Sequence, residues 1–413
     1  KGSFHASSLN LSDLQAFLPF PSSIDDSFRI DANITGTDTH INIHELAINS
    51  DTHRLSLTTK GVVNLPCWQL DNLNFECSED VINDLSTRFS SQGIALPPVL
   101  GQLGMIRLSA NGRSDGTIQT LNAIMSTDIG ELIIEGQHNK KSKMFSSSAN
   151  LPNLKLNELQ FAGNEFGRLT ANIKLNGKWG DKNALLINAD ADIPQLEWRG
   201  YNYRQCQFNG KYQHGEMNIN GRINDPLLTA SLSADYKKEK AEHSLLLRTE
   251  VNELHPQALN LSDRWEDAVF SGQLNADLRG SNIDNIIGQC ELRQLSMTRP
   301  DGSDIYTLKQ LSLQSEQEGE DRHLQIKSDF GSVEIFGQYT LSSIPHSIIS
   351  QLSHRMPTIP IATINASDNK QHSSQSVRNR FTLWGNIEDT QFMRHLLGVD
   401  LRISEPMNIT LRM

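Results

Sequence analysis

Apolar and polar residues alternate with a period of two along most of this 413-residue chain. From residue 169 to residue 179, every second position is apolar or glycine and the positions between them are Thr, Asn or Lys. The same division recurs at residues 28–36, 228–236, 272–280 and 333–341. A strand with this pattern has one face in water and one face against apolar groups. The pattern therefore predicts an all-β protein with a mostly antiparallel sheet.

Glycine recurs on the apolar positions of these strands, two residues after an apolar side chain. Nine positions share this property: Gly36, Gly112, Gly136, Gly177, Gly210, Gly221, Gly280, Gly337 and Gly385. Glycine inside a strand packs no side chain, so it tends to mark a bend, a bulge or the close approach of another backbone. The recurrence predicts that the strands bend at a common place and curl the sheet into a taco-like trough. At any single position, an ordinary turn glycine is the alternative.

Longer self-similarity indicates a repetitive, elongated body. The sequence STDIGELIIEGQ at 126–137 is echoed by SDFGSVEIFGQ at 328–338, and NEFGRL at 164–169 is a weaker third copy. Repeats of this kind predict units that contact mainly their neighbours. We expect β-groove segments at 1–92, 93–250 and 251–356, a polar mobile loop at 357–380, and the start of another repeat at 381–413.

Helices are expected to be few and short. Residues 78–92 place Ile82, Leu85 and Phe89 on one face, as an amphipathic helix requires. Residues 12–18 and 345–356, each ended by a proline, are weaker candidates. Each predicted helix plugs an end of the sheet, covers its apolar face, or lies on the surface.

Composition and charge narrow the class of protein. Hydrophobic residues make up 37% of the chain, aromatic residues 6% and charged residues 21%, which is lean for a large globular enzyme and too apolar for disorder. The formal net charge is −11 and no run of five Lys or Arg occurs, which argues against nucleic acid as a partner. The chain holds no apolar stretch of the roughly 18 residues that a membrane-spanning helix needs. Any membrane contact is expected through regions outside this sequence.

None of the common sequence motifs for nucleotide binding, hydrolase nucleophiles or zinc proteases occurs in the chain. Asp329-Phe330-Gly331 matches three letters of a kinase motif, but its companion motifs are missing, so we interpret it as a turn. His40 and His44 lie on one side of a predicted strand, about 13 Å apart, which is too far for two ligands of one zinc ion. No catalytic residue, metal site or cofactor is predicted, and the chain is not expected to be an enzyme.

The four cysteines lack the spacing of a metal site. Cys67 and Cys77 lie ten residues apart across an expected turn. They either face each other as a disulfide or are two small buried residues.

Several stretches resemble a known family. They are VNELHPQALNLSDRW at 251–265, FSGQLNADLRG at 270–280, TLKQLSL at 307–313, LQIKSDF at 324–330 and GQY at 337–339. Together they resemble the TamB-type translocation and assembly module proteins of Gram-negative bacteria. Residues 212–225 look like the AsmA-like repeat of the same superfamily. The resemblance extends in pattern over residues 105–413 and is most specific between 251 and 341.

This resemblance implies a periplasmic protein, anchored in the inner membrane by a helix outside this sequence. It also implies a long curled β-sheet whose apolar groove carries phospholipid toward the outer membrane. An outer-membrane barrel-assembly protein is a further partner that the family implies. This chain lacks the family's anchor and its C-terminal domain, so partner docking by the fragment is not carried over.

The first hypothesis is that the apolar face shelters lipid acyl chains. The predicted lining consists of Ile34, Leu108, Ile134, Ile173, Leu175, Ile219, Leu232, Leu278, Ile335 and Leu383. The second hypothesis is a scaffold that receives outer-membrane protein strands by edge pairing. The third is a closed β-solenoid adhesin or glycan-binding module. The same alternation fits an open groove and a closed core.

Overall fold

The computed structural model describes residues 2–10, 27–37, 39–83, 86, 98–160, 163–180, 185–239, 242–344, 379–398, 400 and 402–412. Strands account for 70% of the chain, and 22 strands of the described part belong to one antiparallel sheet. The predicted all-β, antiparallel fold is confirmed. The antiparallel pairing of successive strands differs from a β-solenoid, in which successive coils stack in parallel.

The chain divides into two compact units. Unit 1 contains Lys1–His214 and Ile223–Asp225, and unit 2 contains Gly215–Arg222 and Pro226–Met413. The strand β13 (Glu216–Asp225) is divided between them. The predicted five-segment division stays a prediction.

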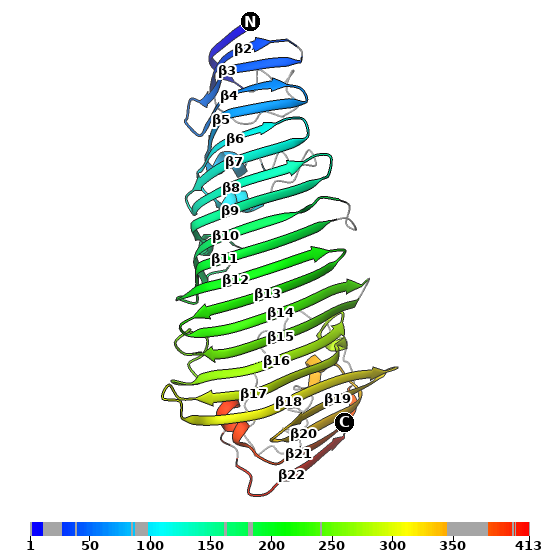
Figure 1. Cartoon of the computed structure of the whole chain (residues 1–413). Coiled ribbons are helices and arrows are strands. Elements are labelled where there is room, and N and C mark those ends of the chain that lie inside the picture. Colours follow the sequence, from blue (N-terminus) through cyan, green and yellow to red (C-terminus); the bar gives the residue numbers. More distant parts are fainter. Residues whose placement is uncertain are drawn as a thin grey trace. The chain divides into compact units, whose positions relative to one another are not determined.

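In unit 1, the strands from β1 to β12 pair in sequence order, each with the next, and Figure 1 shows this order from blue to green. The strands are β1 (Gly2–Asn10), β2 (Ser27–Gly36), β3 (His40–Ser50), β4 (Leu55–Asn64), β5 (Cys67–Cys77), β6 (Ile106–Ser114), β7 (Ile118–Thr127), β8 (Gly130–Asn139), β9 (Met144–Lys155), β10 (Phe166–Lys178), β11 (Leu186–Trp198) and β12 (Tyr201–Gln213). Residues 79–83 form a helix, and η2 (Pro98–Gln102) and η3 (Leu156–Glu158) are single turns.

Unit 2 continues the same neighbour-to-neighbour pairing. Its strands are β14 (Leu228–Glu239), β15 (Glu242–Leu254), β16 (Val269–Gly280), β17 (Ile287–Thr298), β18 (Asp304–Glu318), β19 (Asp321–Ser328), β20 (Gly331–Gln338), β21 (Arg380–Ile387) and β22 (Met407–Arg412). The single turns η4 (Ile283–Asn285) and η5 (Leu341–Ser343) and the π-helical turn η7 (Met393–Leu397) accompany them.

Two prolines inside strands explain two irregularities of register. Pro152 in β9 and Pro194 in β11 each lie at a register shift against β10. Proline has no backbone N–H to donate, so a strand paired on both sides tolerates it only at a bulge. Both bulges lie beside Ala171 of β10, whose side chain is buried.

Short elements cover the apolar face of unit 1 at one end of its strands. The residues 79–83 carry the buried side chains Val81 and Ile82, which pack with Cys77, Ile106 and Leu159. Most of the remaining predicted helix, including Leu85 and Phe89, lies outside the described residues, as do the predicted helices at 12–18 and 345–356. The predicted loop at 357–380 also lies outside them, apart from its last two residues.

Unit 2 has two such covered regions. In one, Tyr339, Ile344 and Phe381 pack on Leu324 and Ile335. In the other, side chains from outside the strands, namely Trp265, Phe392 and Leu396, pack against a buried group. That buried group consists of Ala268, Phe270, Met297, Tyr306 and Leu308. The Trp265 indole N–H donates to the His395 carbonyl at 2.9 Å, which fixes this cover in place.

An aspartate recurs where a strand ends, and its carboxylate accepts a backbone N–H of the preceding strand region. Asp128 accepts from Met105 at 3.0 Å, Asp225 from Arg204 at 2.9 Å, and Asp329 from Lys309 at 2.7 Å. The predicted equivalence of the turns at 128–130 and 329–331 is therefore visible in their hydrogen bonds. Each carboxylate thereby satisfies a backbone donor of a neighbouring strand or of the residue that precedes it.

Cys67 and Cys77 do not lie across a turn, and this expectation was wrong. They are the first and last residues of the single strand β5, and both are free thiols. The eleven residues of that strand hold them about 33 Å apart, so they cannot face each other.

Replacing Asp225 by alanine should lower the free energy of unfolding by about 2–4 kcal/mol, because two hydrogen bonds lose a buried charged acceptor. The second of these bonds is donated by the Tyr201 hydroxyl at 2.6 Å. Urea denaturation measures the change. The exposed Asp277→Ala is the matched control and should shift stability by about 0.5 kcal/mol or less. Equal effects of the two variants would contradict this role.

Stability should fall as the pH rises from about 9 to about 11. Burial raises the pKa of the Cys77 and Cys206 thiols from 9.0 to about 11. The unfolded chain ionises these thiols near pH 9, whereas the folded protein ionises them only near pH 11. The stabilisation that the neutral thiols provide below pH 9 is therefore lost as the pH rises through the pKa of the folded protein. Urea midpoints measured across this range should fall less in Cys77→Ala/Cys206→Ala than in Cys67→Ala, whose substituted thiol is less buried.

Candidate functional site

Backbone pairing aligns residues of the apolar face into rows that cross the strands. We call one of them the glycine row, because glycine recurs along it from β2 to β12. Its members are Ile34, Ile43, Gly61, Leu70, Gly112, Leu121, Gly136, Ser147, Leu175, Ala189 and Gly210. The predicted lining residues Ile34 and Leu175 therefore lie in one row, although they are far apart in the sequence.

A second row lies beside it, and we call it the alanine row. Its members are Ala32, Leu46, Thr59, Leu73, Ala110, Ala123, Ile134, Ala149, Ile173, Ala191 and Phe208. It contains the predicted Ile134 and Ile173. The predicted Leu108 lies in a third row, which joins Phe75, Leu108 and Met125. All five predicted lining residues of unit 1 thus share one face and three adjacent rows.

In unit 2, three predicted residues lie in one row, which we call the Leu278 row. It joins Tyr236, Leu245, Leu278, Gly288, Ser315, Leu324, Ile335, Leu383 and Leu411. Leu232 lies in another row of the same face with Leu274, Leu292 and Leu311. Ile219 is half-buried in β13.

Burial divides these rows into open and covered parts. Ile335 and Leu383 are only 4% and 9% exposed, because Tyr339, Ile344 and Phe381 pack on them, so these two predicted residues belong to a core. Leu278, Leu232 and the predicted residues of unit 1 are half-buried or exposed. Leu121 of the glycine row is 45% exposed. The open part of the apolar face is therefore the part that could receive a guest.

The glycine positions differ in how closely another backbone approaches. At Gly36, Gly112, Gly177, Gly280 and Gly337, an added Cβ would lie closer than 3.0 Å to a neighbouring carbonyl oxygen. At Gly136 and Gly385 the nearest atoms are 4.0 Å and 3.7 Å away, which is ordinary contact. Gly210 and Gly221 lie within β12 and β13. Close backbone approach therefore accounts for the absence of a side chain at five of the nine positions.

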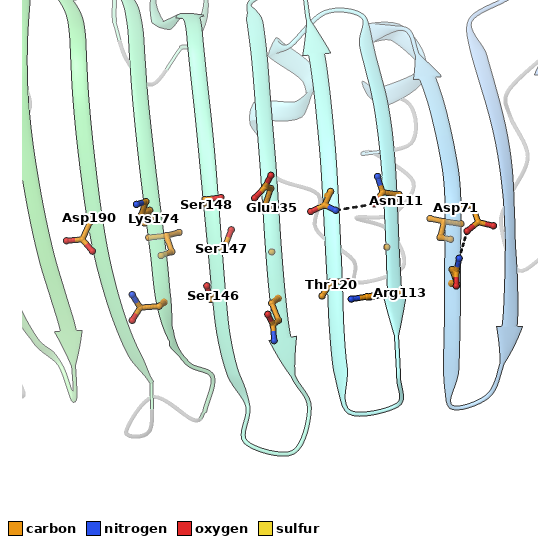
Figure 2. Close-up of a pocket in the computed structure, with 18 residues that line it drawn as sticks. Asp71, Asn111, Arg113, Thr120, Glu135, Ser146, Ser147, Ser148, Lys174 and Asp190 are labelled. Carbon is orange, nitrogen blue, oxygen red and sulfur yellow. Dashed lines mark hydrogen bonds between the residues drawn. The ribbon is translucent and has the colours of Figure 1, made fainter.

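The opposite face of unit 1 carries a polar hollow of about 790 Å³. Asn111, Glu135, Ser148, Lys174 and Asp190 are cross-strand neighbours along β6–β11, joined through Asn122. Figure 2 shows the lining side chains spread over neighbouring strands rather than gathered around one point. Carboxamide pairs stabilise this face, for example Asn122 donating to Asn111 at 3.1 Å and Asn188 donating to Asn176 at 2.9 Å.

The side chains that line the hollow are polar and carry charges of both signs. Its lining holds serines and carboxylates, but neither histidine nor cysteine occurs among the residues that form it. Over the whole described part of the chain, no three His, Cys, Asp or Glu side chains lie close enough to hold a metal ion. Its mixed charges and amides are the chemistry of a hydrated sheet face.

Comparison with protein-family models, with curated proteins and with solved structures finds no match to this chain. In the described residues, none of the helices combines the length and the apolar character that crossing a bilayer requires.

Sequence reasoning missed part of the open apolar face. Leu121, Phe208 and the half-buried Ala32, Ala149 and Ala191 lie on it but were not predicted as lining, whereas Ala110 and Ala123 of the alanine row are buried. The alternation that selected Ile134 and Ile173 was available at each of these positions, so the same signal would have found them. The burial of Ile335 and Leu383 had no such local signal, because the same cluster also includes Ile344, which lies outside the strands.

Two glycines of the glycine row provide a test of close backbone approach. Gly61→Ala should lower stability by about 1–3 kcal/mol, because its Cβ would meet the Gln69 carbonyl oxygen and push β4 from β5. Gly136→Ala should be neutral or raise stability by about 0.5–1 kcal/mol, since space for the methyl group exists and strand glycine costs entropy. Urea denaturation of both variants measures the difference. A larger loss for Gly136→Ala than for Gly61→Ala would refute the close approach.

Proposed function

We propose that this chain is a non-enzymatic lipid-transfer conduit whose half-buried apolar rows shelter the acyl chains of phospholipids. The observation that carries the proposal is the continuity of the glycine and alanine rows over eleven consecutive strands of unit 1. These rows keep apolar side chains on one face while leaving them within reach of a guest.

The energetics favour acyl chains as the guest. A two-chain phospholipid hides roughly thirty CH₂ groups, and burial of each contributes about 0.8 kcal/mol. Such a gain exceeds what a few hydrogen bonds to a headgroup contribute. An apolar face without a shaped pocket is therefore sufficient for binding.

Small side chains add a geometric argument. Glycine, alanine and serine occupy many positions of the two rows, so the surface between flanking Leu and Ile side chains is low. An acyl chain laid along the rows contacts the sheet backbone closely and meets larger side chains on either side. Such a shallow channel fits a flexible hydrocarbon better than a rigid ring system.

The family resemblance supports the same function. If the chain is a TamB-type segment, it works in the periplasm of a Gram-negative bacterium and passes phospholipid between the inner and outer membranes. Its AsmA-like repeats then serve as the conduit, and an outer-membrane assembly protein is a further partner. The scaffold function by edge pairing remains the alternative, in which β1 and β22 receive strands of another protein.

Introducing a carboxylate into the open face should abolish lipid capture. Ile173→Asp and Leu278→Asp place an unpaired charge among apolar side chains, where it costs several kcal/mol or draws in water. Native mass spectrometry of the purified protein should show phospholipid bound to the unaltered chain and little or none on the double variant.

The matched control places the same charge on the polar face. Asn172→Asp and Arg279→Asp lie beside the two substituted residues but point to the opposite side of β10 and β16. This control should retain lipid. Retained lipid on a folded Ile173→Asp/Leu278→Asp variant would refute the conduit. Photocrosslinkers at β1 or β22 that capture outer-membrane protein, with row positions silent, would favour the scaffold.

A further inference from the structure

A buried arginine interrupts the apolar face of unit 2. Arg322 of β19 pairs with Gln317 and Gly337, in the row of the same face that lies next to the Leu278 row. It lies two residues before Leu324, so its side chain points to the apolar side of the sheet. Only 5% of Arg322 is exposed.

The guanidinium has few partners. One of its terminal nitrogens donates to the Ile286 carbonyl oxygen at 2.8 Å, and the same oxygen accepts from the Ser315 hydroxyl at 2.9 Å. The Tyr339 ring lies with its centroid 5.9 Å from the guanidinium carbon. The Nε–H is buried and makes no hydrogen bond.

No carboxylate in the described part of the chain forms an ion pair with Arg322. The nearby acids point elsewhere: Glu316 and Glu318 belong to the polar side of β18, and Glu334 pairs with His323 at 2.6 Å. A carbonyl dipole and an aromatic ring compensate a full positive charge only in part. A buried cation with an unused donor, beside an apolar row, is the expected arrangement for binding an anion.

We propose that Arg322 binds the anionic phosphate of a lipid headgroup whose acyl chains lie on the open part of the Leu278 row. This inference rests on the proposed lipid-binding function and specifies its ligand class as anionic. Arg322 lies between the Leu278 row and Ile286, the residue that follows the turn η4. A headgroup bound there would have its acyl chains beside the apolar row. The Ser315 hydroxyl, which shares the Ile286 carbonyl, is the neighbouring polar group on the same row.

The geometry also sets how the headgroup reaches the charge. The guanidinium is only 5% exposed and the Tyr339 ring lies beside it. Lipid capture at this position therefore requires a local movement that uncovers the guanidinium. Arginine suits the task, because its planar fork donates two parallel hydrogen bonds to a phosphate.

Native mass spectrometry with mixed micelles tests the proposal, using phosphatidylglycerol as the anionic lipid and diacylglycerol as the neutral one. The unaltered protein should prefer phosphatidylglycerol. Arg322→Met should reduce the ratio of anionic to neutral lipid bound by about tenfold or more, because the loss of even one of the two charge-assisted hydrogen bonds has an effect of that size. Arg279→Met removes an exposed arginine of the same unit and should leave the ratio unchanged.

A thermal-unfolding measurement without lipid separates this role from a purely structural one. Arg322→Met removes an incompletely compensated buried charge, so its melting temperature should be equal or higher. Its stabilisation by phosphatidylglycerol should disappear. A lower melting temperature with unchanged anionic preference would assign Arg322 to the fold alone and overturn the proposal.

Arg322→Gln keeps a donor for the Ile286 carbonyl and loses the charge. It must therefore lose the preference for phosphatidylglycerol over diacylglycerol, even if Arg322→Met fails to fold. Equal binding of both lipids by the unaltered protein overturns the headgroup site while leaving the conduit intact. Failure to bind either lipid overturns the conduit itself. Full stabilisation by inorganic phosphate alone would show a site for a free anion and overturn the lipid assignment.

Discussion

Backbone hydrogen bonding between neighbouring strands is the interaction on which everything else in this protein depends. Because each strand pairs with its sequence neighbours, the register fixes which side chains stand beside each other across the sheet. A slip by one residue in any strand would send its apolar side chains to the hydrated face. The bulges at Pro152 and Pro194 absorb an extra residue on both sides of β10 and so preserve the apolar face. The rows of unit 1 exist only because register is maintained through these irregularities.

The turn aspartates have a similar role at the strand ends. Asp128, Asp225 and Asp329 each anchor a turn to a neighbouring strand through a backbone N–H. Burial, together with the hydrogen bond to Asp225, raises the pKa of Tyr201 to about 12. The sequence similarity between 126–137 and 328–338 thus corresponds to a shared hydrogen-bonding solution for ending one strand and starting the next. The two similar segments therefore share the way in which a turn is held against a neighbouring strand, as well as the apolar pattern.

Local alternation was sufficient to predict the strands and the side on which each residue lies. The pattern at 169–179 corresponds to β10, and Ile134, Ile173 and Leu175 lie together on one face because parity determines their direction. The same reasoning failed at β5, where the shift between Leu70 and Leu73 breaks the alternation and made one strand resemble a turn between two cysteines. The alternation along a strand shows on which face a residue lies, but it does not show whether that residue is covered by other side chains. Ile335 and Leu278 have the same local pattern, yet only Ile335 belongs to a buried cluster, which Tyr339, Ile344 and Phe381 complete.

The repetitive glycine and alanine rows have a consequence for motion. Successive strands stand about 4.8 Å apart, so a hydrocarbon chain moving along a row meets nearly the same surroundings at each step. Similar surroundings mean similar free energies, and the barriers between adjacent positions are then low. If the proposed lipid function holds, such a surface would confine an acyl chain to movement along the row without fixing it at one position. Displacement along the sheet would then proceed by thermal diffusion, with its direction set by where lipid enters and leaves.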